Sequence, residues 1–380
     1  MGRWLTAILV VSILAGCSDD EADRKFLFES TRVAGDQGSA RTPFLFYDGY
    51  YLQVVWSEDR GDGPDLYLQG FDKDGSPVGH PRRVTESHWA RRPVVLKIGD
   101  AFLISWTDRV DGMLEVMTAG LNPRGGESLT AVNLSATHAY ASHSPSLIEF
   151  GGKPVLLYKE RTMLTPLHRL MAVELDLQGR PEEEPQPFME IVSVPYNPAL
   201  ATDGRILMIA SNSFSSGKWS LAFTPLRSLK KLPEFTEPVE TESNLWSPAI
   251  TFLGGDFLVA YRNNGPVVPQ IEALRVDSEG SLVSDVSVIG DGQDFVFEPA
   301  VAGDGRRAVV IWREELQGEV DLVARQPDSG DKQVLVEGAG RGDPASALLI
   351  DKNLCMAWET LFEGTGSVYV GCFEAPGGGW

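Results

Sequence analysis

The sequence predicts an all-β fold, a seven-bladed β-propeller, and three observations support this prediction. First, a proline is followed six residues later by a glycine and thirteen residues later by an aromatic residue, as in Pro43, Gly49 and Trp56. Second, this unit returns along the whole chain, with consecutive prolines 50, 52, 53, 50, 51 and 45 residues apart. Third, the unit contains short, apolar, β-branched runs typical of strands. Strand-rich repeats of about 50 residues indicate propeller blades.

Seven units carry the repeat, and five keep all three residues. The fourth unit keeps Pro198 and Gly204 but has Ser211 at the aromatic position, and the seventh has Asp351 in place of glycine. One such unit cannot bury its own faces, so the 380 residues are expected to form one closed array rather than several domains. The complete units are Pro43/Gly49/Trp56, Pro93/Gly99/Trp106, Pro145/Gly151/Tyr158, Pro248/Gly254/Tyr261 and Pro299/Gly305/Trp312, and the seventh pairs Pro344 with Trp358.

Each unit is expected to form four antiparallel strands, named A to D from the inside outward. In the first unit strand A is 43–47, and strand B is 50–56, whose apolar residues suit a strand buried on both faces. Strand C is 65–71 and ends in the turn Asp72–Gly75, where glycine allows the positive φ that closes it. Strand D, about 82–86, is short and polar, as suits an edge.

Proline at the start of strand A has a physical reason. The innermost strand begins where its first N–H needs no partner in the sheet. The residue before each proline is expected to be extended, because the proline ring disfavours the helical conformation there.

The two ends of the chain complement one another. The seventh unit stops after strand C, whereas the segment 28–34 near the N-terminus precedes the first proline without a sheet of its own. We expect 28–34 to serve as strand D of the last blade, which removes two open edges. In that blade Cys355 on strand B and Cys372 on strand C would lie opposite one another, so a disulfide is predicted.

The N-terminus is typical of an exported lipoprotein. Arg3 precedes the apolar run 4–14, which is too short to span a bilayer permanently, and Leu14-Ala15-Gly16-Cys17 is similar to a bacterial lipobox. The expected organisation is a signal peptide over 1–16, an acidic tether over 17–25 with Cys17 lipidated, and the propeller over 26–380. Ser18 indicates the outer membrane. A plain signal peptide remains the alternative.

The formal net charge of -20 makes nucleic acid an unexpected partner, because such a surface repels phosphate backbones. The membrane is expected to be contacted through the lipid anchor only. The five histidines lack the spacing of a metal site, and no cofactor motif occurs in a strand–helix setting, so no metal, cofactor or catalytic residue is assigned.

The end of strand B carries a signature with acidic and basic residues, as in Val55-Trp56-Ser57-Glu58-Asp59-Arg60 and Ser105-Trp106-Thr107-Asp108-Arg109. With Asp65-Leu66-Tyr67 and Gly70-Phe71-Asp72 downstream, the unit resembles the VVWSD-type repeats of exported bacterial β-propeller lipoproteins of the myxobacterial type. This resemblance implies the fold and the export of the protein as a lipoprotein, and it implies little about function.

The D–A and B–C loops share one face of a propeller, called here the top face. The D–A loops hold aromatic, basic and acidic residues of the kinds that bind glycans or peptides, although such rings can also cap the core. The acids and arginines that end strand B recur in the blades, so a structural role such as inter-blade ion pairs is expected for them. The binding candidates are Trp89, Arg92, Tyr140, His143, Tyr196, Trp246, Phe297, Glu298, Arg341 and Asp343.

Three functional hypotheses follow. The leading one is a non-catalytic, lipid-anchored propeller that binds an envelope protein or a surface glycan. One alternative is a propeller enzyme, a hydrolase or lyase, that acts on glycans, and the other is a scaffold subunit of an outer-membrane assembly or motility complex. The scarcity of catalytic motifs favours binding over catalysis at this level.

Overall fold

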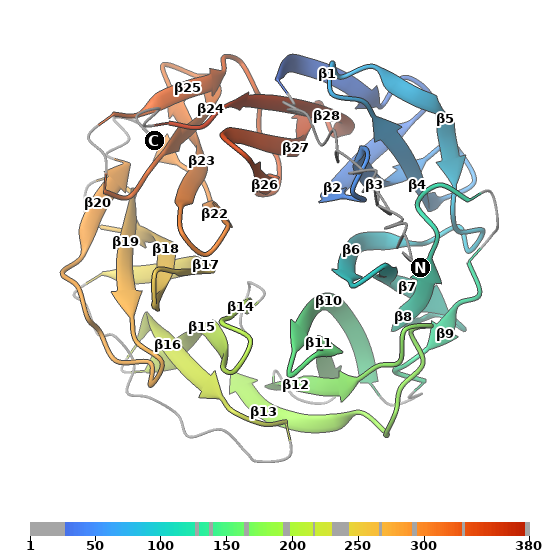
Figure 1. Cartoon of the computed structure of the whole chain (residues 1–380), viewed down its shortest axis with the longest axis horizontal. Helices are drawn as coiled ribbons and strands as arrows, with labels where there is room; N and C mark the ends of the chain where they lie inside the picture. Colours follow the sequence, from blue (N-terminus) through green and yellow to red (C-terminus); the bar gives the residue numbers. More distant parts are fainter. Residues whose placement is uncertain are drawn as a thin grey trace, which may run out of the picture.

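The computed structural model describes residues 27–125, 129–136, 140–162, 167–192, 198–215, 217–229, 243–265, 268–290, 295–328 and 331–376. These residues form seven sheets, one for each repeat unit, arranged radially around a central axis (Figure 1). The prediction of an all-β, seven-bladed propeller is confirmed. In the part of the chain that the structure describes, no helix is long and apolar enough to cross a membrane.

The first three blades each run in chain order from the inside outward, with antiparallel neighbours. Blade 1 comprises β2 (Ser39–Tyr47), β3 (Leu52–Asp59), β4 (Pro64–Phe71) and β5 (Pro77–Arg83); blade 2 comprises β6 (Arg91–Ile98), β7 (Ala101–Val110), β8 (Met113–Leu121) and β9 (Val132–Asn133); blade 3 comprises β10 (Tyr140–Phe150), β11 (Lys153–Thr162), β12 (Leu167–Glu174) and β13 (Gln186–Val192).

The next three blades follow the same plan. Blade 4 is described over β14 (Ala199–Thr202), β15 (Leu207–Ser215) and β16 (Lys218–Leu226); blade 5 over β17 (Asn244–Leu253), β18 (Asp256–Asn264), β19 (Gln270–Val276) and β20 (Ser287–Gly290); and blade 6 over β21 (Phe295–Val296), β22 (Ala300–Gly303), β23 (Ala308–Leu316), β24 (Glu319–Arg325) and β25 (Gln333–Val336).

Blade 7 is closed by the N-terminal strand, as expected. Its sheet has the order β1 (Phe28–Ala34), β28 (Thr365–Glu374), β27 (Asn353–Phe362) and β26 (Ser346–Ile350), so the first and last strands of the described chain lie side by side (Figure 1). The pairing of Phe28 with Cys372 and of Thr31 with Val370 fixes the register. The ring therefore closes through main-chain hydrogen bonds between the two ends of the chain.

The repeat aromatic residues form the core between neighbouring blades. Trp56, for example, is fully buried and packs with Cys355, Ala357 and Val370 of the preceding blade. Trp106, Tyr158, Tyr261, Trp312 and Trp358 are also buried, as predicted for this position. Burying an aromatic side chain of this size contributes several kcal/mol, so each blade depends on the one before it.

Strand D of blade 1 lies earlier in the sequence than predicted. It covers Pro77–Arg83 rather than 82–86, and pairing begins directly after the C–D turn with Phe71 opposite Pro77. Beyond Arg83 the Val84 N–H still bonds to Leu66 O at 2.8 Å, and the chain then turns away because Asp65 accepts hydrogen bonds from the Thr85 hydroxyl and from the backbone N–H groups of Ser87 and His88. The alternation of polar and apolar residues in the sequence cannot reveal these hydrogen bonds to a carboxylate on the neighbouring strand.

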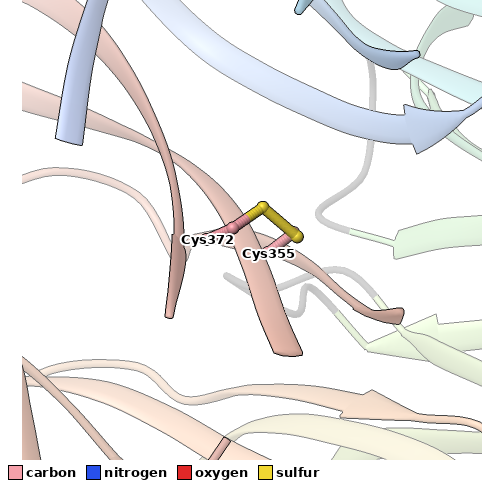
Figure 2. The surroundings of a disulfide bond; sticks show 2 residues. All are labelled: Cys355 and Cys372. Carbon is pink, nitrogen blue, oxygen red and sulfur yellow. A yellow bond between two sulfur atoms is a disulfide. The ribbon is translucent and has the colours of Figure 1, made fainter. Parts of the chain in front are cut away.

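The predicted disulfide is present. Cys355 on β27 and Cys372 on β28 are direct cross-strand partners, with their Cα atoms 4.0 Å apart and a sulfur–sulfur bond (Figure 2). Trp358 and Tyr369 pair three residues nearer the turn, and their rings stack at 5.8 Å. The bridge therefore joins the two strands to which β1 is added.

Removing the bridge should destabilise the whole ring. A Cys355→Ala/Cys372→Ala double variant is expected to lose about 3 kcal/mol of unfolding free energy, because a 17-residue separation sets the closure entropy of the unfolded chain. Denaturant unfolding with and without reductant measures this loss. Equal stability of the oxidised and reduced wild-type protein would contradict the prediction.

Candidate functional site

A cavity of about 600 Å³ lies at the top of the central channel. Its wall repeats with the blades: all seven repeat prolines line it, and so does the residue before the proline in the six units where the structure describes that residue. These six preceding residues are polar or charged, namely Thr42, Arg92, Ser144, Ser247, Glu298 and Asp343. The cavity thus collects one polar side chain from each of six blades, and three of them, Arg92, Glu298 and Asp343, were predicted as binding residues.

The backbone before the proline corrects one expectation. Thr42, Arg92, Ser144 and Ser247 are left-handed, with φ of 49°, 53°, 59° and 51°, rather than extended. At each of these four places two residues of strand A oppose one of strand B; Arg41 pairs with Ser57 and Phe44 pairs with Val55, which leaves Thr42 and Pro43 opposite Trp56. The left-handed residue is the extra one of a β-bulge, a feature that often re-aims a side chain near a functional site.

The bulge is held by the preceding blade. On strand B, the residue directly after the repeat aromatic position contacts the D–A segment of the next blade through its side chain. Some of these side chains donate a hydrogen bond and others accept one. The contacts are Ser57 Oγ to Ala90 O (2.8 Å), Ser144 N to Thr107 Oγ1 (3.1 Å), Asn212 Nδ2 to Leu245 O (2.7 Å), Arg262 Nη1 to Glu298 Oε1 (3.4 Å), Arg313 Nη1 to Gly342 O (2.9 Å) and Thr42 N to Glu359 Oε2 (2.6 Å).

Asp343 is positioned by two buried charges of this kind. Arg313 donates to the carbonyl oxygens of Asp343, Gly342 and Glu359, and the Glu359 carboxylate accepts the backbone N–H of Asp343 at 3.1 Å. Burial lowers the pKa of Arg313 to about 10, so it stays charged at neutral pH. Asp343 itself is exposed at the cavity wall, on a backbone that these contacts fix.

A basic sector occupies blades 2 and 3. His143 Nδ1 lies 2.8 Å from the hydroxyl of Ser144, which lines the cavity. Burial, followed by the nearby charges of Lys159, His168, Arg92 and Arg161, lowers the pKa of His143 to about 4. The imidazole is therefore neutral at pH 7 and able to accept a proton.

A second sector, on blades 5 and 6, contains aromatic rings and an acidic residue. Glu298 lines the cavity and pairs with Arg262, whose guanidinium lies 4.5 Å from the centre of the Phe295 ring. Phe297 packs against Phe295 at 5.0 Å, and Arg341 lies 5.9 Å from its ring centre while it pairs with Glu315 at 2.8 Å. Trp246, half-buried, occupies in blade 5 the repeat position that Phe297 has in blade 6.

Six of the predicted binding residues within the described ranges do not line this cavity, namely Trp89, Tyr140, His143, Trp246, Phe297 and Arg341. Trp89 is stacked with Arg91 at 4.6 Å and Arg109 at 5.6 Å, and Tyr140 is covered by Arg169 at 5.4 Å. Both rings are satisfied by neighbouring cations on the top face. Tyr196 lies outside the described residues, as do Cys17 and the tether. Within the described ranges, no group of three or more metal-ligating side chains occurs.

The acids that end strand B have structural partners, mostly within their own blade rather than between blades. Glu58 accepts from Trp56 Nε1 at 3.2 Å and from Arg60 at 2.7 Å, and Asp108 accepts from Trp106 Nε1 at 2.9 Å. In blades 1 and 2 the carboxylate thus satisfies the indole N–H of the repeat tryptophan, which would otherwise be buried without a partner. Arg313 differs, since it reaches the next blade.

The sequence analysis missed Thr42, Ser144 and Ser247 as cavity residues. The signal that could have found them is their place directly before a repeat proline, which they share with Arg92, Glu298 and Asp343. Small hydroxyl residues are common in loops, so composition alone did not separate them from ordinary turns.

Several solved structures are similar to this chain in fold. No protein-family model matches the chain, and no curated protein matches its sequence. A solved structure of a PL25 ulvan lyase bound to -[GlcA(1-4)Rha3S]- is similar with a TM-score of 0.62 and 10% identity, over 90% of this chain and 95% of that one. The oligogalacturonate lyase of Vibrio parahaemolyticus is similar with a TM-score of 0.59 and 11% identity, over 92% and 94%. At these identities the similarity establishes the propeller fold.

These relatives contradict the leading functional hypothesis. A non-catalytic binding propeller was expected because catalytic motifs are scarce, yet the solved structures that match most of the chain include propeller lyases. They agree better with the alternative, a propeller enzyme that acts on glycans. The physical reason for the error is that the cavity side chains come from separate blades, so no compact motif could reveal them.

The buried His143 should make stability fall in acid. Its pKa is about 4 in the folded chain against an ordinary value of 6.5, so between these values the unfolded state takes up a proton that the folded state does not. The free energy of unfolding of the wild type should fall by on the order of 2–3 kcal/mol more than that of His143→Gln as pH drops through this window. Parallel pH-dependent losses in urea unfolding of the two proteins would contradict the assignment.

Proposed function

We propose that this protein is a glycan-acting enzyme whose reaction takes place in the cavity at the channel mouth, and that the reaction is a β-elimination on a uronate-containing glycan. One observation carries the proposal. Arg92 and Ser144 line the same cavity, and the neutral imidazole of His143 lies behind Ser144, with Nδ1 2.8 Å from its hydroxyl. The fold shared with uronate-cleaving lyases supports this chemistry.

Arg92 is suited to hold the uronate carboxylate. It is exposed at the wall of the cavity, and its left-handed backbone, held by a hydrogen bond from its N–H to Thr42 Oγ1 at 3.3 Å, fixes where the side chain begins. A guanidinium can bind a carboxylate with two parallel hydrogen bonds. Neutralising that carboxylate makes the adjacent C5 proton more acidic, which is the first requirement of the elimination.

A general base must be unprotonated at the working pH, and the low pKa of His143 meets this condition at neutral pH. As the C5 proton passes to His143 by way of Ser144, a C4–C5 double bond forms, the C4–O bond of the leaving sugar breaks, and the leaving oxygen takes a proton from water. Glu298 and Asp343, on the other blades of the wall, are placed to orient sugar hydroxyls.

The proposal predicts the product and the residues that matter. The wild type should release products that absorb ultraviolet light through a C4–C5 double bond when it is incubated with oligogalacturonate, ulvan or another uronate-containing polysaccharide. Arg92→Ala and His143→Ala should each lose about 10²-fold or more in kcat/KM, as expected for removing a charge clamp or a general base.

Matched controls lie away from the cavity. Arg306→Ala, at an exposed turn, and His80→Ala, on the outer strand of blade 1, should keep full activity. New reducing ends without the double bond would show hydrolysis and reject the elimination. Full activity in Arg92→Ala and His143→Ala would reject this site.

We also propose that Cys17 carries a lipid and tethers the propeller to the outer membrane with the cavity facing away from it. Phe28 at the start of β1 packs against Gly75 in the C–D turn of blade 1, on the face opposite the D–A loops. The chain that precedes β1 therefore enters at the bottom of the ring. The acidic segment 17–25 would stay solvated near anionic lipid.

The anchor proposal predicts that Cys17→Ser releases the protein from the membrane fraction, whereas the disulfide variant Cys355→Ala/Cys372→Ala stays there. Fractionation of cells that express each protein and mass spectrometry of the N-terminal peptide measure this. A wild-type protein without lipid on Cys17 would contradict the anchor and leave the enzyme proposal intact.

A further inference from the structure

A second pocket, of about 290 Å³, lies in the seam between blades 1 and 2 near the top face. Its floor is apolar, because Val84, Trp106 and Met117 belong to the hydrophobic cluster between these blades or pack against it. Its volume is close to the lower end of the range for small-ligand pockets, about 300–1,000 Å³, so it has room for one sugar ring. Ser87 and Arg109 on its edge are exposed, which opens the pocket to solvent.

The edge of this pocket is polar. Glu86, Ser87 and Arg109 are exposed there. Asp108 also lines the pocket, but its carboxylate already accepts hydrogen bonds from the repeat tryptophan and from the N–H of Arg109. Arg109 Nε donates to Gly112 O at 3.2 Å, which orients the guanidinium, and its Nη groups have no acceptor in the described part of the chain. These Nη groups are therefore available to an acidic group, and Glu86 and Ser87 to sugar hydroxyls.

One stretch of chain joins this pocket to the central cavity. The segment that follows β5 lines the pocket over 84–87 and lines the cavity from Arg92 onward. Ser87 and Arg92 are five residues apart, so their Cα atoms are separated by at most about 18 Å. The Asp65 carboxylate accepts two N–H groups of this segment, and Ser57 Oγ donates to one of its carbonyl oxygens. The pocket and the cavity are thus held a short, fixed distance apart on the top face.

The surface between the pocket and the cavity is basic and aromatic. The centre of the Trp89 ring lies 4.6 Å from the Arg91 guanidinium and 5.6 Å from that of Arg109. Arg92, next to Arg91 in the sequence, lines the cavity. We call Arg92, Arg91, Trp89 and Arg109 the arginine strip. The ring supports two of its guanidinium groups through cation–π contacts, so both are held at the surface between the two openings.

The three arginines of the strip carry charges that no acid neutralises. Arg91, Arg92 and Arg109 are exposed, and none of them forms an ion pair with another residue in the described ranges. Arg60 and Arg83, on the neighbouring blade 1, instead each pair with a buried carboxylate. In a chain whose formal net charge is -20, three unpaired arginines at one place make a local site of attraction for an anionic partner.

A chain of acidic sugars matches this surface better than a small anion does. Every uronate unit of such a chain carries a carboxylate, so neighbouring units can reach different guanidinium groups of the arginine strip. The ring that enters the pocket can lay its C–H groups on the apolar floor, while its hydroxyl groups bond to Glu86 and Ser87 at the edge. The charge of the strip and its continuity with the cavity therefore point to the same occupant.

We propose that the arginine strip and this pocket bind acidic sugar units of the same glycan chain whose reacting unit lies in the central cavity. The inference rests on the function proposed above only for the reaction in the cavity, since the strip and the pocket bind the acidic chain whether or not it reacts. It assigns polymeric acidic glycans as the substrate class, because a disaccharide that fills the cavity leaves the strip and the pocket empty.

Binding measured without turnover tests the strip. In a His143→Gln background, isothermal titration should show polygalacturonate and alginate binding about tenfold or more tighter than digalacturonate, and no binding of uncharged dextran. Arg91→Gln and Arg109→Gln should each weaken polymer binding about three- to tenfold, as expected for loss of a charge-assisted hydrogen bond at an exposed position. The matched control Arg205→Gln, at an exposed A–B turn of blade 4, should bind as the background protein does.

A pocket-blocking variant separates the pocket from the charges. Ser87→Phe places a ring at the pocket edge and removes no charge, so it should keep its Tm and still lose polymer affinity. Polymer binding at background strength in both Arg91→Gln and Arg109→Gln would overturn the proposal, and so would equal affinity for polymer and digalacturonate. Polyglutamate bound as tightly as polygalacturonate would show a general polyanion surface and overturn the glycan assignment.

Product analysis separates this inference from the proposed reaction. Polymer binding that depends on Arg109, without double-bond products from the wild type, would reject the elimination and keep the strip as a glycan-binding surface. Double-bond products formed from the polymer with kcat/KM unchanged by Arg91→Gln and Arg109→Gln would keep the elimination and overturn the strip.

Discussion

The β-bulge before the repeat proline is the constraint on which the rest of the structure depends. The proline has no N–H for the sheet, and in four blades the residue before it is the left-handed extra residue of strand A. This arrangement turns backbone groups toward the preceding blade, where the side chain after the repeat aromatic residue binds them. The same bulge points the residue before the proline at the central cavity. One local distortion thus joins the blades and builds the wall of the site.

Because most contacts between neighbouring blades are made to backbone groups, the side chains that make them can differ from blade to blade. Ser57, Thr107, Arg313 and Glu359 make the same kind of contact with hydroxyl, guanidinium or carboxylate groups. At the cavity wall the corresponding positions range from serine to arginine and aspartate. A nearly symmetric ring therefore carries an asymmetric site, with the basic Arg92 on blade 2 and the acidic Glu298 and Asp343 on blades 6 and 7. This is how one propeller fold can support different chemistries without a change in its core.

Closure of the ring gives that site its rigidity. The strand β1 adds to β28, and the disulfide ties β28 to β27, so the joint between the chain ends is covalently supported on one side. Glu359 of this last blade accepts N–H groups from both Thr42 and Asp343, which lie on opposite sides of the joint. The cavity wall is continuous across the place where the chain begins and ends. Fixed donors and charges of this kind are what a pre-organised site requires.

The sequence by itself determined the blade number, the buried aromatic position, the closing strand and the Cys355–Cys372 pair, because these follow from a repeated period and from pairing within one hairpin. It also named Arg92, Glu298 and Asp343 among the candidates. Tertiary structure alone decided the left-handed φ before the prolines, the hydrogen bonds between blades, and the satisfaction of Trp89 and Tyr140 by arginines. It also lowered the pKa of His143. The hydrogen bonds between blades join neighbouring units, and Tyr140 and His143 depend on charged groups of other strands, so no local pattern encodes them.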